Sequence, residues 1–192
     1  MATTDLTPVF TLADAQAQGL RKDQVYKMLA EGEIERAGRG VFLRPNAIDP
    51  AFVALAASTA VQPNATLCLT SALVHHQLSD AIPTVTDIAL PRGTRYPAGF
   101  AHVAWHSFDN ATFTIGREHH TVAAGTCVAI YSAERTIGDC FRLMHLEGSD
   151  VAYEALRRWL RRRGNWPAAL LRMTDSFPKA EPRLRHALEV LS

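Results

Sequence analysis

Basic and amide side chains occur at a spacing that suits contacts with nucleic acid. Residues 21–31 fit an amphipathic helix whose apolar face includes Val25 and Leu29. Residue types that reach base edges or phosphates lie on its other side, and two basic residues stand at its N-terminus. These polar positions are Arg21, Lys22, Gln24 and Lys27. The segment therefore predicts a helix that reads DNA.

Three arginines follow in a glycine-rich segment that predicts a hairpin. Arg39 stands between two glycines at the tip, where a guanidinium suits a narrow minor groove. Arg36 and Arg44 lie along the predicted strands and suit phosphate contacts. Four acidic residues oppose this interpretation because each repels phosphate: Asp23, Glu31, Glu33 and Glu35. The alternative is a small cap that packs its hairpin on the rest of the chain.

A second group of arginines lies nearer the C-terminus. Residues 150–163 fit an amphipathic helix, and residues 155–172 hold six arginines and no acidic residue. The apolar face of this helix consists of Ala152, Ala155, Leu156 and Trp159. The other face carries Arg157, Arg158 and Arg161, with Arg162 at its edge. This face is either an ordinary solvated surface or an electrostatic surface for nucleic acid or an acidic partner protein.

The elements that position the first group are those of a winged helix-turn-helix. We expect a helix over 12–18 capped by Thr11, a tight turn at Gly19, and a second helix that ends at Gly32. Strands over 33–36 and 41–44 form the hairpin wing. In this motif the second helix enters the major groove and the wing grips the adjacent backbone or minor groove.

The rest of the chain predicts a mixed α/β (α+β) domain that ends in helices. The segment 44–50 holds two prolines among polar residues, so we expect domains at 1–46 and 47–192. The predicted strands are 87–90, 103–106, 112–115, 119–122 and 128–131. The predicted helices are 51–61, 71–78, 133–146, 150–163, 167–174 and 182–191.

Composition is that of an ordinary folded protein. Of the 192 residues 47% are apolar and 20% are charged, and the net charge of +1 lacks the strong excess usual in nucleic-acid binders. Apolar runs are too short to span a membrane. The N-terminus has no basic segment before an apolar core, so we expect a cytoplasmic protein without a signal peptide.

The sequence predicts no metal, cofactor or catalytic site. Neighbouring histidines at 75–76 and 119–120 point apart, and His102 and His106 are about 13 Å apart on a strand. Phosphate-loop, nucleophile-elbow, zinc-protease and dinucleotide motifs are absent, so we expect that the protein is not an enzyme. Three cysteines without a Cys-x-x-Cys pair predict buried free thiols: Cys68, Cys127 and Cys140.

Most of the chain, from about residue 8 to the end, resembles the AbiEi family of antitoxins. The N-terminal part of the resemblance runs from Phe10-Thr11 to Val41-Phe42. The C-terminal part comprises Thr70–Leu73, Asp87–Gly93, Tyr131–Arg142 and Asp150–Arg157. Its most specific element is the Ser-x-Glu-Arg-Thr-x-x-Asp stretch at 132–139.

This resemblance implies an antitoxin of a type IV toxin–antitoxin system. In that family the N-terminal domain represses its own operon by binding inverted repeats in upstream DNA. The C-terminal domain counteracts a nucleotidyltransferase-like toxin encoded alongside, without forming a stable complex. The residues alone leave two alternatives, a stand-alone winged-helix regulator and a nucleic-acid-processing enzyme.

The 132–139 stretch has a structural interpretation. Glu134 suits the positive end of a helix, and Arg135 can pair with Asp139 one turn further on. We therefore expect a latch between sheet and helix rather than a catalytic group.

Overall fold

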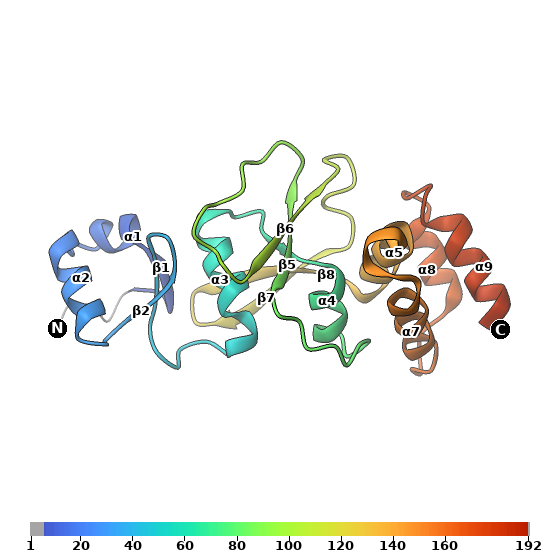
Figure 1. Ribbon diagram of the computed structural model, residues 1–192, viewed down its shortest axis with the longest axis horizontal. Coiled ribbons are helices and arrows are strands. Elements are labelled where there is room, and N and C mark those ends of the chain that lie inside the picture. Colours follow the sequence, from blue (N-terminus) through green and yellow to red (C-terminus); the bar gives the residue numbers. More distant parts are fainter. Residues whose placement is uncertain (1–5, 192) are drawn as a thin grey trace.

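Residues 6–191 are described in the computed structural model, and they form a mixed α/β protein elongated along one axis (Figure 1). A helical and stranded unit lies at the N-terminal end, a five-stranded sheet lies in the middle, and a group of helices closes the other end. None of the helices in this range is long and apolar enough to cross a bilayer.

The N-terminal unit comprises β1 (Val9–Thr11), α1 (Leu12–Ala17), α2 (Lys22–Ala30), β2 (Glu35–Gly38) and β3 (Val41–Leu43). The predicted cap of α1 is confirmed, because the Thr11 hydroxyl accepts from the amide of Asp14 while the Asp14 carboxylate accepts from the amide of Thr11. Gly32 has φ +75° just after the end of α2, as a terminating glycine requires.

The small sheet has the order β1-β3-β2 and is covered on both faces. Phe10 and Phe42 point to α1 and α2, with ring centroids 5.8 Å apart. The alternate residues point the other way and share an apolar cluster with α3 (Pro50–Val61): Val9, Val41 and Leu43. Apolar packing therefore runs continuously from the hairpin into the residues beyond 47.

The central sheet has the order β6-β5-β4-β8-β7 and mixes parallel and antiparallel pairs. Its strands are β4 (Thr66–Leu67), β5 (Thr86–Pro91), β6 (Val103–Phe108), β7 (Arg117–Ala123) and β8 (Thr126–Tyr131), with α4 (Leu69–His75) after β4. The predicted strand over 112–115 is wrong, because these residues form turns. Backbone carbonyls there accept hydrogen bonds from a buried arginine instead of pairing with a strand.

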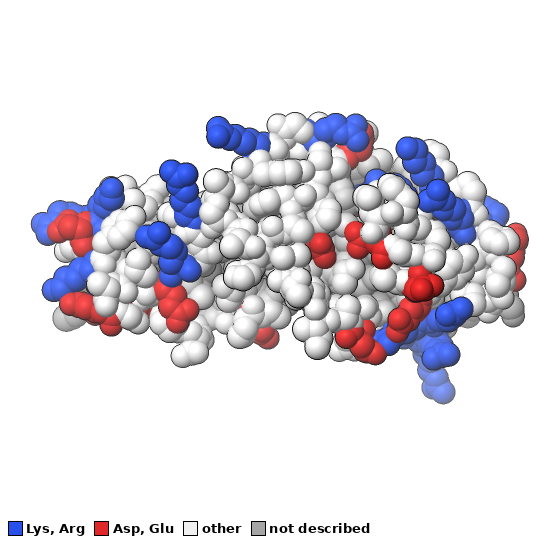
Figure 2. All heavy atoms as spheres, viewed as in Figure 1, with Lys and Arg blue, Asp and Glu red and all other residues white. Residues whose placement is uncertain are grey.

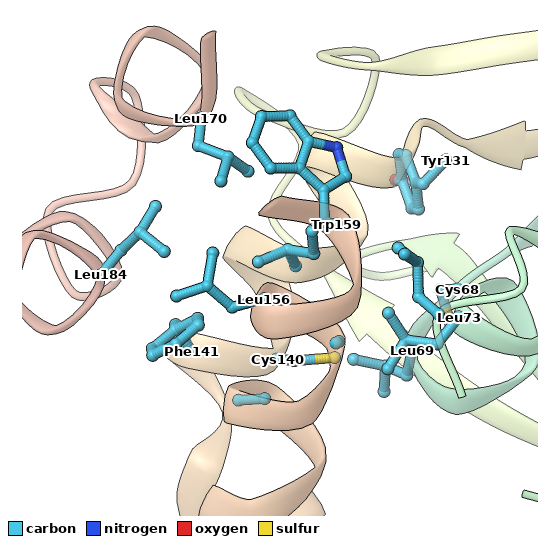
Figure 3. Packing of buried hydrophobic residues seen from close by; sticks show 14 of the residues in the cluster. Cys68, Leu69, Leu73, Tyr131, Cys140, Phe141, Leu156, Trp159, Leu170 and Leu184 are labelled. Atoms are coloured by element: carbon cyan, nitrogen blue, oxygen red, sulfur yellow. The ribbon is translucent and has the colours of Figure 1, made fainter. Parts of the chain in front are cut away.

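The C-terminal helices are α5 (Ala133–Arg142), α6 (Met144–Glu147), α7 (Ser149–Leu160), α8 (Pro167–Thr174) and α9 (Glu181–Leu191). The single helix predicted over 133–146 breaks at Leu143. Figure 3 shows Leu156 and Trp159 of α7 among side chains of α5, α8 and α9, so the predicted apolar face of α7 is confirmed. Cys68 and Cys140 are buried as expected, whereas Cys127 is exposed, which corrects the prediction for that thiol.

Arg135 ties three segments together in this core. Its guanidinium is 1% exposed and donates to the Asp139 carboxylate at 2.8 Å, which confirms the predicted pair. It also donates at 2.7 Å to the carbonyl oxygens of Thr112 and Ile115. The ring centroids of Tyr131 and Phe177 lie 4.4 and 4.3 Å from its Cζ. Arg135 therefore holds the turns at 112–116, strand β8 and helix α5 together.

The hairpin tip touches a distant loop, residues 92–102 between β5 and β6. A Cβ atom at Gly38 would lie 2.8 Å from the ring of Phe100, and one at Gly99 would lie 2.6 Å from the Cβ of Arg39. Gly99 also has φ +85°, which side chains rarely adopt. Position 99 therefore needs glycine for the hairpin and the loop to meet, whereas a side chain at position 38 would displace the ring of Phe100.

Gly99→Ala is expected to cost about 2–4 kcal/mol of folding free energy, from backbone strain together with the clash against Arg39. Gly93→Ala is the matched control, because Gly93 has φ +89° but nothing within 4 Å of the added Cβ atom. Gly93→Ala should therefore lose only the folding free energy that comes from backbone strain. Urea denaturation of both variants checks this, and equal losses in the two would contradict the contact.

Candidate nucleic-acid interface

One exposed face of the N-terminal unit combines two cations with an aromatic ring. Tyr26 on α2 is 39% exposed, and its ring meets the edge of Phe42 with centroids 6.1 Å apart. Lys22 Nζ and Arg36 Cζ each lie 5.9 Å from the centroid of the Tyr26 ring. We call Lys22, Tyr26 and Arg36 the α2–β2 face. It joins α2 to β2, the two elements on which the sequence predicts DNA contacts.

The sequence did not single out Tyr26. The available signal was its position one helical turn after Lys22, at the border of the apolar face that contains Val25. An exposed tyrosine between cations presents a flat ring and a hydroxyl to a sugar–phosphate backbone.

The other predicted residues of α2 are exposed but have local partners. Arg21 lies before the first helical residue and pairs with Asp23 at 3.1 Å, and this hydrogen bond raises the pKa of Arg21. The Gln24 side-chain oxygen accepts from the Arg21 amide at 2.8 Å, so Gln24 caps the helix. Lys27 pairs with Glu31 at 3.7 Å. Water and salt screen exposed pairs of this kind, so a phosphate can replace the acidic partner.

Three of the four acidic residues oppose DNA less than the sequence suggests, whereas Glu33 is exposed and has no ion-pair partner among residues 6–191. Asp23 and Glu31 are paired with Arg21 and Lys27. Glu35 is next to Arg36 along β2, so its side chain points to the opposite face of the sheet. There it lines a hollow with Leu43, Asp49, Pro50 and Val53, away from Tyr26.

The three arginines of the hairpin segment differ in exposure and in their neighbours. Arg36 joins the α2–β2 face, and Arg39 is exposed at the tip of the hairpin beside Gly99. Arg44 is half-buried, and its Nη2 atom is shielded from solvent with no hydrogen-bond partner among the described residues. Arg44 is therefore the least suited of the three to a phosphate.

The arginines of α7 and of the turn that follows it divide into two kinds, those with partners and those without. Arg158 binds both Asp80, at 2.8 Å from Nη1, and Glu154, and the hydrogen bond to Asp80 raises its pKa. Arg162 donates to the carbonyl oxygens of His76 and Gln77 at 2.7 and 2.8 Å. These two residues hold the segment after α4 against α7.

Arg157 and Arg161 are exposed, and neither side chain forms an ion pair or hydrogen bond with another residue in the range 6–191. Figure 2 shows basic side chains projecting at the lower end of α7, beside acidic ones. Of the four arginines predicted to contact a partner, only these two therefore remain available to do so.

Three of the eight histidines lie close together. The rings of His76 and His120 lie 5.0 and 5.7 Å from that of His75, centroid to centroid, and burial lowers the pKa of His75. Across residues 6–191, no group of three or more His, Cys, Asp or Glu side chains has a geometry that could hold a metal ion.

A serine, an aspartate and a histidine also meet, at the edge where β5 and β6 pair. The Asp87 carboxylate accepts from the Ser71 hydroxyl at 3.0 Å and lies 2.9 Å from His106 Nε2. Because the carboxylate separates the other two groups, the imidazole does not hydrogen-bond to the hydroxyl as a general base must to activate a nucleophile. This cluster ties α4, β5 and β6 together.

Comparison with known proteins bears on the fold alone. No protein-family profile matches the chain, and no curated protein matches it. Among solved structures, the crystal structure of the RV2827C protein from Mycobacterium tuberculosis is similar, with a TM-score of 0.68 and 19% sequence identity. The match covers 94% of this chain and 71% of that one, so the arrangement of elements occurs in another protein.

Proposed function

We propose that this protein is a DNA-binding repressor of its own operon and acts as the antitoxin of a type IV toxin–antitoxin system. The observation that carries the DNA-binding half is the α2–β2 face, where Lys22 and Arg36 flank the exposed ring of Tyr26. The proposal is supported because these residues come from the helix and the hairpin, the two elements expected to contact DNA in a winged helix-turn-helix.

The helix α2, which presents this face, is packed against the core of the N-terminal unit. Val25 is fully buried, and the ring of Tyr26 contacts that of Phe42. A face held in place before binding loses little conformational freedom when DNA docks. An inverted repeat has two half-sites, so two copies of the chain would occupy one operator.

The antitoxin half rests on the resemblance of residues 131–142 and the neighbouring segments to AbiEi antitoxins. The proposed partner is a nucleotidyltransferase-like toxin, opposed without a stable complex and without catalysis by this chain. Exposed Arg157 and Arg161 are the surface we assign to this task, and the cytoplasm is the proposed compartment.

A gel-shift titration tests the repressor half. The probes are the duplex upstream of the gene and a scrambled duplex of the same length, each at two salt concentrations. We expect tighter binding to the upstream duplex and weaker binding at higher salt, because phosphate contacts release counterions. Equal affinity for both probes would overturn the proposal.

Co-expression with the nucleotidyltransferase-like toxin that we propose is encoded alongside tests the antitoxin half. The intact chain is expected to restore growth, and R157A/R161A is expected to lose rescue while it still binds DNA. K179A/R185A is the control matched in charge, since it removes two exposed cations elsewhere, one of which, Arg185, pairs with Glu181. Specific DNA binding without any rescue by the intact chain would favour a stand-alone regulator instead.

A further inference from the structure

The loop over 92–102 belongs to the central sheet but lies against the wing. Figure 1 shows this green segment reaching from β5 toward the N-terminal unit before it returns to β6. The close approaches of Gly38 to Phe100 and of Gly99 to Arg39 join its far end to the hairpin tip. The loop and the tip therefore form one continuous surface.

Aromatic packing and backbone hydrogen bonds hold this loop in one shape. The rings of Tyr96 and Trp105 stack with centroids 6.1 Å apart, and Phe100 meets Trp105 edge-on at 5.8 Å. The carbonyl oxygen of Arg95 accepts from Gln62 Nε2 at 3.5 Å, and the Thr94 amide donates to Pro91. The backbone that carries Arg95 is thus held in a defined position relative to that of Arg39.

The charge on this surface is positive. Arg95 and Arg39 are both exposed, and neither has an ion-pair partner in the described part of the chain. Residues 92–102 contain no acidic residue. Arg92, by contrast, pairs with Asp109 at 2.9 Å and is neutralised. Figure 2 shows basic side chains along the upper edge, from the N-terminal unit to this loop.

We propose that the 92–102 loop is a second DNA-contacting element and that Arg95 binds a backbone phosphate beside the one reached by Arg39. This inference rests on the proposed DNA binding. It assigns a DNA contact to the part of the chain beyond residue 47, which the sequence assigned to the antitoxin role. Phosphate contacts position the protein without reading sequence, so Arg95 strengthens binding to any duplex.

Salt-dependent titration of Arg95→Ala tests this inference on the upstream and scrambled duplexes. Loss of one phosphate contact is expected to reduce the slope of log K against log salt by about 0.9 on both probes. Arg95→Lys keeps the charge and should retain the wild-type slope. Arg163→Ala is the matched control, because it removes an exposed arginine beyond the end of α7.

The outcomes separate this inference from the repressor role. If the wild type prefers its upstream duplex and Arg95→Ala has the same slope as Arg163→Ala, the loop contact is overturned and the repressor role stands. If the wild type binds both duplexes equally and Arg95→Ala still lowers the slope, the loop contact stands and the repressor role fails. Absence of binding to either duplex overturns both.

Discussion

Replacement of Arg135 by alanine is expected to lower the free energy of unfolding by about 3–5 kcal/mol, the usual loss when a buried ion pair loses one partner. The carbonyl oxygens of Thr112 and Ile115 would lose their shared donor, and Asp139 would keep only Arg142. The substitution would also remove the cation from between the rings of Tyr131 and Phe177 and leave a cavity there. Chemical denaturation monitored by circular dichroism measures the loss.

Arg157→Ala provides the control for this experiment. It removes an arginine from an exposed position without a partner in residues 6–191, so its effect should stay within about 0.5 kcal/mol. A loss below about 1 kcal/mol in Arg135→Ala would contradict the role of Arg135 as the main tie between α5 and the 112–116 turns, because even one net hydrogen bond contributes that much.

Replacing both cations of the α2–β2 face is expected to have the largest effect on DNA binding. If Lys22 and Arg36 each contact a phosphate, K22A/R36A reduces the slope of log K against log salt by roughly 1.8, at about 0.9 for each contact. If either one reads a base instead, about 1–3 kcal/mol of preference for the upstream duplex is lost. Both side chains are exposed, so the fold should be unaffected.

K179A/R185A serves as the charge-matched control for that titration. It removes two cations near α9, at the other end of the molecule (Figure 1). Wild-type affinity in the control and weakened binding in K22A/R36A would locate the DNA on α2 and the wing. Equal weakening in both variants would show that net charge, rather than this face, sets the affinity.

Local patterns were enough to predict much of the N-terminal unit. Thr11 as a cap, Gly32 as a terminator and a glycine-rich hairpin are signals carried by a few neighbouring residues. The short strands β1 and β4 were missed, because two or three residues are too few to show an alternating pattern. Their partners β3 and β8 are distant in the chain and hold them in place.

The site was harder to predict than the fold because its details depend on contacts between distant segments. The sequence placed Arg158 and Arg162 on a polar helix face, but it could not show that residues 76–80 pack there and accept their hydrogen bonds. The same holds for the meeting of Gly99 with Arg39, which are 60 positions apart. Arg135 and Asp139 were predictable because one helical turn separates them.

Affinity for upstream against scrambled DNA, compared between the wild type and K22A/R36A, tests whether the α2–β2 face recognises DNA. We expect that the wild type binds the upstream duplex more tightly, and that the double variant binds more weakly with a shallower salt dependence. A wild type without preference, or a double variant that binds like the wild type, would contradict the assignment of DNA recognition to the α2–β2 face.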